Sequence, residues 1–183
     1  MSVVSLAELL ESGVEAVRNS SSSTKIILHF AGLDNSDWFF TQINSIDYDI
    51  IGLSYYPIWH GKSLSQLQTT LDQLARKYDK EVIIAETAYP FTLGWNDWTN
   101  NIVGLPEQLL PNYPATEEGQ KNYVEAIVSL SKTVTKGIGF CYWGAELIAW
   151  KGTESEDASP WENQALFDFT NQALPVLTAF AIE

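Results

Sequence analysis

The chain is poor in cysteine and in basic residues, and it has no long apolar run. Its 183 residues include one cysteine, Cys141, which excludes an internal disulfide framework. Only 10 Lys and Arg stand against 23 Asp and Glu, and the net charge of −13 argues against nucleic acid or an anionic membrane surface as a partner. No apolar stretch approaches the ~20 residues of a membrane span, and the first residues lack the basic and then apolar layout of a signal peptide.

Aromatic residues, by contrast, are plentiful: they make up 13% of the chain and include seven tryptophans. The rest of the composition, 45% apolar and 18% charged, is typical of a globular protein, and the length predicts a single domain over residues 1–183. Aromatic side chains suit the apolar faces of sugar rings, so the composition leaves a sugar or another neutral or cationic ligand open.

Short apolar runs alternate with helix-like segments along the chain. We expect strands at residues 25–30, 48–55, 81–86 and 137–143, and helices at 5–18, 36–43, from 63, from 116 and near 173–182. Ser5 with Glu8 and Ser63 with Gln66 predict capping boxes, and Thr116 predicts a third helix start. The alternation predicts an α/β fold with a parallel sheet and right-handed crossovers.

Ligands of parallel α/β folds bind beyond the carboxyl ends of the strands, so the residues that end each strand are the candidates for chemistry. Glu86 closes the run Val82–Ala85, where a carboxylate is costly to bury unless it is hydrogen-bonded or catalytic. It can be a glycosidase nucleophile, with Tyr56 or His29 as hydrogen-bond donor, or a structural carboxylate bonded to loop amides. His29 can equally be a strand-end histidine bonded to backbone, and we expect His60 to be exposed in a loop.

Five tryptophans fall in or beside the loops that follow the strands, and together they favour a stacking cleft for sugar rings. Any single one of them can be ordinary packing. The five are Trp59, Trp95, Trp98, Trp143 and Trp150.

Cofactor motifs are missing from the sequence. The two histidines and one cysteine give no zinc signature, no Gly-rich nucleotide motif occurs, and Ser54 has no G-x-S-x-G setting. Asp34–Asp37 and Asn96–Asp97 could place oxygens around calcium, although neither matches a recognised calcium loop. We therefore expect no cofactor, with calcium as the one alternative.

Four segments together resemble glycoside hydrolase family 53, the endo-β-1,4-galactanases that cut the galactan side chains of pectin. They are residues 49–60 (DIIGLSYYPIWH), 84–90 (IAETAYP), 139–146 (GFCYWGAE) and 159–168 (SPWENQALFD). The resemblance implies a retaining hydrolase built on a (β/α)8 barrel, whose nucleophile ends the seventh strand and whose acid/base glutamate, preceded by Asn, ends the fourth. It implies that full-length members are secreted or periplasmic, and that some relatives carry calcium on the loop after the seventh strand.

The matching motifs imply a role for each candidate residue. Glu86 resembles the nucleophile, and Tyr56 resembles the tyrosine that hydrogen-bonds it. Trp143 resembles the eighth-strand tryptophan below the subsite before the scissile bond, and His29 would end the fifth strand and point into the cleft. Trp59 and Trp95 complete the expected substrate-binding set, and no residue is expected to bind a metal.

The resemblance covers only four strands, whereas a complete barrel takes ~250 residues. We therefore expect half of a TIM barrel, with four parallel strands equivalent to strands 5–8, flanking helices, and no Asn-Glu pair at any strand end. Glu146 is the other carboxylate near a strand end. The expected function is that of a retaining galactanase fragment on galactan or arabinogalactan, inactive alone; the alternatives are an inactive glycan-binding or assembly half-barrel and a relative acting on another β-glycan. Open sheet edges predict a homodimer or pairing with an N-terminal half.

Overall fold

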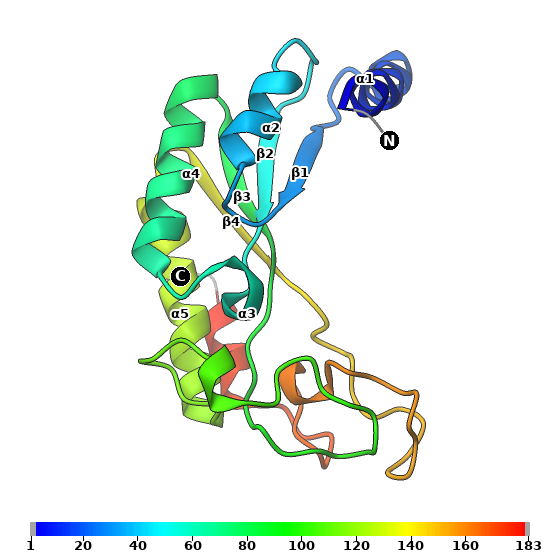
Figure 1. Ribbon diagram of the computed structural model, residues 1–183, viewed down its shortest axis with the longest axis vertical. Coiled ribbons are helices and arrows are strands. Elements are labelled where there is room, and N and C mark those ends of the chain that lie inside the picture. Colours follow the sequence, from blue (N-terminus) through cyan, green and yellow to red (C-terminus); the bar gives the residue numbers. More distant parts are fainter. Residues whose placement is uncertain (1–2, 182–183) are drawn as a thin grey trace.

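The computed structural model describes residues 3–181, with side chains described from residue 5 onward. Four parallel strands form one sheet in the order β1-β2-β3-β4, so each strand pairs with its neighbour in sequence and β1 and β4 are the edges (Figure 1). The strands are β1 (Ile27–Ala31), β2 (Ile50–Ser54), β3 (Glu81–Thr87) and β4 (Gly137–Tyr142), and the α-helices are α1 (Val3–Ser20), α2 (Ser36–Gln42), α3 (Pro57–His60), α4 (Leu64–Tyr78) and α5 (Glu117–Thr133).

The helices α4 and α5 run along one side of the sheet, and the long loops gather beyond the carboxyl ends of the strands (Figure 1). Those loops contain two short 3₁₀ helices, η1 (Pro106–Gln108) and η2 (Glu162–Gln164), and a third, η3 (Pro175–Phe180), packs against α5. Within residues 3–181, no helix is both long enough and apolar enough to cross a bilayer.

Two of the three predicted helix starts are confirmed. The Ser63 hydroxyl accepts from Gln66 N at 3.2 Å, and the Thr116 hydroxyl accepts from Gly119 N at 2.9 Å, as expected of N-cap residues. The predicted capping box at Ser5 is wrong, because α1 already includes Val3 and Ser5 lies inside the helix. An N-cap residue lies just before the first helical residue, and α1 already includes residues before Ser5.

The C-terminal helix predicted near residues 173–182 is also wrong in type. The structure has the 3₁₀ helix η3 over Pro175–Phe180, and Ile182 lies outside the described residues. Pro175 at the first position starts the segment. Val176 is fully buried, so packing against α5 rather than helical propensity holds this short turn in place.

The two faces of the sheet differ in burial because side chains alternate along each strand. Leu28, Leu53 and Ile84 are buried in the main core. The opposite face carries Ile27, which is 44% exposed, and His29. Gly52 lies between them: a Cβ at this position would come within 3.0 Å of Ile27 Cγ2 and 3.1 Å of Ala85 Cβ, so a side chain here would push these neighbours outward.

Both β3 and β4 contain a bulge. In β3 one extra residue lies between Ile84 and Thr87, since Leu53 pairs with Ile84 whereas the next residue, Ser54, pairs with Glu86. In β4 an extra residue lies at Ile138, between the partners of Val82 and Ile83. A bulge re-aims the side chains that follow it and is frequent beside active sites.

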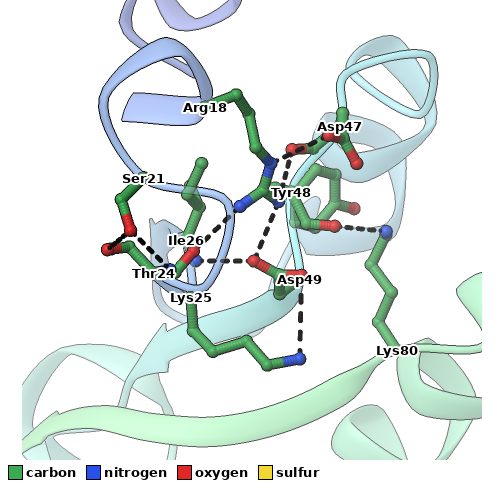
Figure 2. Close-up of polar contacts among 9 residues, drawn as sticks. All are labelled: Arg18, Ser21, Thr24, Lys25, Ile26, Asp47, Tyr48, Asp49 and Lys80. Atoms are coloured by element: carbon green, nitrogen blue, oxygen red, sulfur yellow. Dashed lines mark hydrogen bonds and ion pairs between the residues drawn. The ribbon is translucent and has the colours of Figure 1, made fainter. Parts of the chain in front are cut away.

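The amino-terminal end of the sheet is held by a network of charged groups (Figure 2). Arg18, in the last turn of α1, donates to Asp47 at 2.8 Å and to Asp49 at 2.9 Å, and also to the carbonyl of Thr24 at 2.9 Å. Asp49 in turn accepts from Ile26 N at 2.8 Å. The network ties α1 to the starts of β1 and β2.

Candidate active site

Glu86 lies near the carboxyl end of β3, and the bulge decides which way its side chain points. Strict alternation would place it with Val82 and Ile84, toward the helices. Beyond the bulge it is Thr87 that faces α5, where its hydroxyl lies 2.6 Å from Tyr123 Oη in a fully buried contact. Glu86 therefore points to the other face, where its side chain is 32% exposed.

Tyr56 holds one oxygen of this carboxylate. Its phenol donates to Glu86 Oε2 at 3.1 Å, and the residue is only 5% exposed. Burial first, and then the charge and hydrogen bond of Glu86, raise the pKa of Tyr56 far above its usual value of 10. The phenol stays protonated and remains a donor to the carboxylate over the whole physiological range.

His29 faces the other oxygen. Its Nδ1 lies 4.0 Å from Glu86 Oε1, and its Nε2 lies 2.8 Å from Ser54 Oγ. The alternative of a strand-end histidine bonded to backbone is therefore not what the structure has: the ring bridges two side chains at the carboxyl ends of β2 and β3. The structure brings three of the predicted site residues together here, namely His29, Tyr56 and Glu86.

His60 is not the exposed loop residue that the sequence suggested. It ends α3, its Nδ1 accepts from Tyr56 N at 3.0 Å, and its ring packs against Gly32, where a Cβ would come within 2.8 Å of His60 Cδ2. Burial lowers the pKa of His60 below 6.5, against the opposing charges of Asp34 and Glu86. This histidine fixes the backbone of Tyr56 and so supports the donor to Glu86.

An aromatic cluster lies next to Tyr56. The Tyr56 ring lies 5.3 Å from Trp59 and 5.6 Å from Trp161, and Trp161 lies 6.3 Å from Trp143. Trp59 is 53% exposed and Trp143 is 43% exposed, so both present surface to solvent in the cluster that contains Tyr56, the donor to Glu86. Trp161 joins the two tryptophans and was missed as a site residue, because it lies far along the loop after β4 and not at the end of the strand; its sequence signal is the motif at residues 159–168.

The other three predicted tryptophans do not join this cluster. Trp95 is 51% exposed in the loop between β3 and α5, and Trp98 and Trp150 are still more exposed. Within residues 3–181, none of the three makes a ring contact with another aromatic residue, and Trp150 lies under the ammonium group of Lys151 instead. Of the five tryptophans, Trp59 and Trp143 belong to this aromatic cluster, and a stacking cleft for sugar rings that also uses Trp95 stays a prediction.

Glu146 is the second carboxylate near a strand end. It follows β4, is exposed, and its side chain makes no hydrogen bond or ion pair within the described part of the chain. Retaining hydrolysis needs two carboxyl groups roughly 5 Å apart. Glu86 has Tyr56 and His29 as its polar neighbours and no carboxylate among its contacts in residues 3–181.

The loops beyond the strands are joined by a buried carboxylate. Glu162 is 1% exposed and its Oε1 accepts from Asn96 N at 2.7 Å, which ties the loop after β4 to the loop after β3. Burial and then the charge of Asp97 raise the pKa of Glu162. Among the described residues no group of three or more His, Cys, Asp and Glu could hold a metal, but buried oxygens without partners remain on Asp97, Glu162 and Asn101.

Comparisons with known proteins agree with this geometry. The family model of glycosyl hydrolase family 53 matches residues 2–180. An arabinogalactan endo-β-1,4-galactanase of Cellvibrio japonicus is 41% identical over 95% of this chain and 48% of its own length, and an endo-β-1,4-galactanase of Bacillus subtilis is 30% identical over 96% and 49%. The solved family 53 catalytic domain of Ignisphaera aggregans superposes with a TM-score of 0.82 at 34% identity, covering 95% of this chain and 51% of that one.

The fold and the site define half of a (β/α)8 barrel, with four parallel strands equivalent to strands 5–8 and a carboxylate at a strand end, as the sequence predicted. The chain belongs to glycoside hydrolase family 53. It spans about half the length of the curated relatives that it matches.

Proposed function

We propose that this chain is the half-barrel that supplies the nucleophile of a retaining β-1,4-galactanase acting on galactan or arabinogalactan. The observation that carries the proposal is Glu86, turned by the β3 bulge to the open face of the sheet and held by Tyr56 at 3.1 Å. The tryptophans Trp59 and Trp143 beside it offer apolar surface to galactose rings. The substrates named for the family 53 relatives support the choice of glycan.

The chemistry assigned to Glu86 is nucleophilic. A carboxylate oxygen attacks the anomeric carbon, the glycosidic C–O bond breaks, and the leaving oxygen takes a proton from an acid. Water then attacks the glycosyl ester, loses a proton to the same acid/base group and releases the carboxylate. Tyr56 stays a donor throughout, so it orients the carboxylate and does not exchange its proton.

The acid/base carboxyl group is the part that these residues do not supply. We expect negligible turnover from this chain alone, because loss of general acid assistance typically costs ~10²–10⁴-fold. A reducing-sugar assay on potato-type galactan tests this, first with the chain alone and then with the amino-terminal half-barrel of a relative added. Turnover with the added half supports the proposal; turnover by the chain alone, comparable to that of whole relatives, would contradict it and make Glu146→Gln the next variant.

A glycan-binding role without catalysis is the second candidate, and the exposed indoles of Trp59 and Trp143 favour it. Retention of the chain on immobilised galactan, with no hydrolysis even after the other half-barrel is added, would select this role. A panel that includes mannan and xylan separates galactan from other β-glycans, since a relative acting on another β-glycan would prefer one of those.

The sheet edges are the surface that we propose for a protein partner, either a second copy or an N-terminal half-barrel. β1 and β4 each have a free edge in the sheet order, and Ile27 and Ile138 on these strands are 44% and 46% exposed. Pairing both edges would close the sheet, which removes unpaired backbone groups. Light scattering measures the outcome: twice the 20.5 kDa chain mass supports the homodimer, whereas a stable monomer removes it.

The proposed reaction uses carboxyl groups and no cofactor. Calcium is the alternative ligand, and the unpartnered oxygens of Asp97, Glu162 and Asn101 are the hard donors that would hold it. There it would act as a clamp between the loops after β3 and β4, with no part in bond breaking. A rise in Tm on adding calcium chloride, reversed by EDTA and lost in Asp97→Ala, would support binding. The Asp34–Asp37 segment offers less, because Asp37 already pairs with Lys77.

A further inference from the structure

His29 is placed between a hydroxyl group and a carboxylate. Its Nε2 lies 2.8 Å from Ser54 Oγ, and its Nδ1 faces Glu86 Oε1 at 4.0 Å. A neutral imidazole carries its proton on one ring nitrogen and a lone pair on the other. The Ser54 hydroxyl group therefore has to match the tautomer of His29, and the tautomer decides whether Glu86 faces a donor or a lone pair.

The burial of Ser54 decides between the two tautomers. Ser54 is 3% exposed, and within residues 3–181 the one hydrogen-bond partner of its Oγ is His29 Nε2. If Nε2 carried a proton and donated to Oγ, the hydroxyl hydrogen would be buried with no acceptor, which is unfavourable. Only the tautomer with its proton on Nδ1 lets Ser54 donate.

The second histidine of the chain has the opposite requirement. His60 Nδ1 accepts the backbone N–H of Tyr56 at 3.0 Å, so this nitrogen must carry the lone pair and the proton must be on Nε2. The two histidines therefore serve one carboxylate from opposite tautomers. His60 orients the Tyr56 donor, and His29 presents its own Nδ1–H.

We propose that Ser54 is a positioning residue, whose hydroxyl group locks His29 in the Nδ1–H tautomer and so aims a second donor at Glu86. Tyr56 donates to Oε2 at 3.1 Å, and an Nδ1–H on His29 would face Oε1 across 4.0 Å, a contact longer than a hydrogen bond that adds to the electrostatic field at this oxygen. The hydrogen bond from Tyr56 orients the carboxylate, and the polarity of His29 Nδ1 decides whether its other oxygen faces a proton or a lone pair. The importance of this arrangement for catalysis rests on the proposed role of Glu86, whereas the tautomer of His29 does not depend on that role.

The chain is well suited to a direct test, because it contains two histidines only. Long-range ¹H–¹⁵N NMR distinguishes a protonated from an unprotonated ring nitrogen, and it is recorded at about pH 8.5, two units above the ordinary histidine pKa, where the neutral form of an ordinary histidine dominates. We expect one ring with its proton on Nδ1, assigned to His29 by its loss in His29→Gln, and one with its proton on Nε2, assigned to His60. A wild-type spectrum with the proton of His29 on Nε2 overturns the proposal without any variant.

Variants of Ser54 then test the cause. In Ser54→Ala we expect the two ¹⁵N shifts of His29 to move toward each other as both tautomers become populated, and in Ser54→Thr we expect the wild-type pattern to return. Ser131→Ala is the matched control, since Ser131 is also buried and its hydroxyl group donates to Val128 O at 2.8 Å on α5. An unchanged His29 pattern in Ser54→Ala overturns the proposal. A failure of galactan hydrolysis after the amino-terminal half-barrel is added, with the expected tautomers, would instead count against the proposed function alone.

Discussion

Charged side chains have different partners at the two ends of the sheet. At the amino-terminal end several charged groups have a partner of opposite charge or a carbonyl: Arg18 binds Asp47 and Asp49, and Lys80 donates to Tyr48 O at 2.6 Å (Figure 2). At the carboxyl-terminal end Glu86 has a phenol and an imidazole beside it and no Lys or Arg among its contacts in the described residues. Neutralised charge serves stability, whereas a carboxylate kept free of cations can attack a substrate.

The largest effect is expected at the carboxyl-terminal end. Glu86→Gln should lower turnover on galactan by about 10³-fold or more in any assembly that hydrolyses it, because an amide oxygen is a poor nucleophile. The free energy of unfolding should change by less than about 0.5 kcal/mol, since the site is partly solvated and Tyr56 still has an acceptor. Reducing-sugar assays and urea denaturation measure the two quantities. A fully active variant would remove Glu86 from the mechanism.

At the amino-terminal end of the sheet we expect a loss of stability and no change in galactan binding. Asp49→Ala should lower the free energy of unfolding by about 1–3 kcal/mol, because it leaves Ile26 N without its acceptor and Arg18 without one of its two carboxylates. Galactan binding should not change. Asp79→Asn is the control: Asp79 pairs with Lys136 at this end but is highly exposed, and Asn tolerates its left-handed backbone (φ 56°), so the loss of this charge should matter less. Equal losses from both variants would contradict the structural role given to Asp49.

The aromatic cluster gives a smaller effect. Trp59→Ala should weaken galactan binding by about 2- to 10-fold, the range expected from loss of one stacking contact of 0.5–1.5 kcal/mol. Trp38→Ala is the matched control, because Trp38 on α2 is 51% exposed, close to the 53% of Trp59, but lies on the helix side. Affinity electrophoresis in galactan compares them. If Trp95→Ala weakens binding as much as Trp59→Ala, the cleft extends onto the loop after β3.

The smallest effect concerns pH. Burial lowers the pKa of His60, so the unfolded chain binds its proton more tightly than the folded one. The contribution of His60 to stability is therefore complete above pH ~6.5 and is lost as the pH falls from there toward the lowered pKa. His60→Asn keeps an acceptor for Tyr56 N but does not titrate, so the stability of this variant should depend less on pH between about 7.5 and 5. Urea denaturation measures the free energy of unfolding of both proteins at each pH. An equal change of this free energy with pH in both proteins would contradict the prediction.

The catalytic candidate itself followed from the position of a carboxylate after an apolar run, and the same reasoning located His29 and Tyr56. The orientation of Glu86 did not follow, because strict alternation from Val82 points it toward the helices. One extra residue in β3 reverses that direction, and such a residue is visible only in the pairing of Ser54 with Glu86 across two strands.

The sequence by itself determined the succession of strands and helices along the chain and the helix starts at Ser63 and Thr116, since local spacing and capping chemistry act within a few residues. It also determined the family, through four motifs that stand in order along the chain. Tertiary structure alone decided the β3 bulge, the approach of Trp161 to Trp59 and Trp143, the burial of His60 and the opposite requirements of the two imidazoles. These depend on partners that are distant in the chain. Their free energies come from pairing and packing between elements, which no local pattern contains.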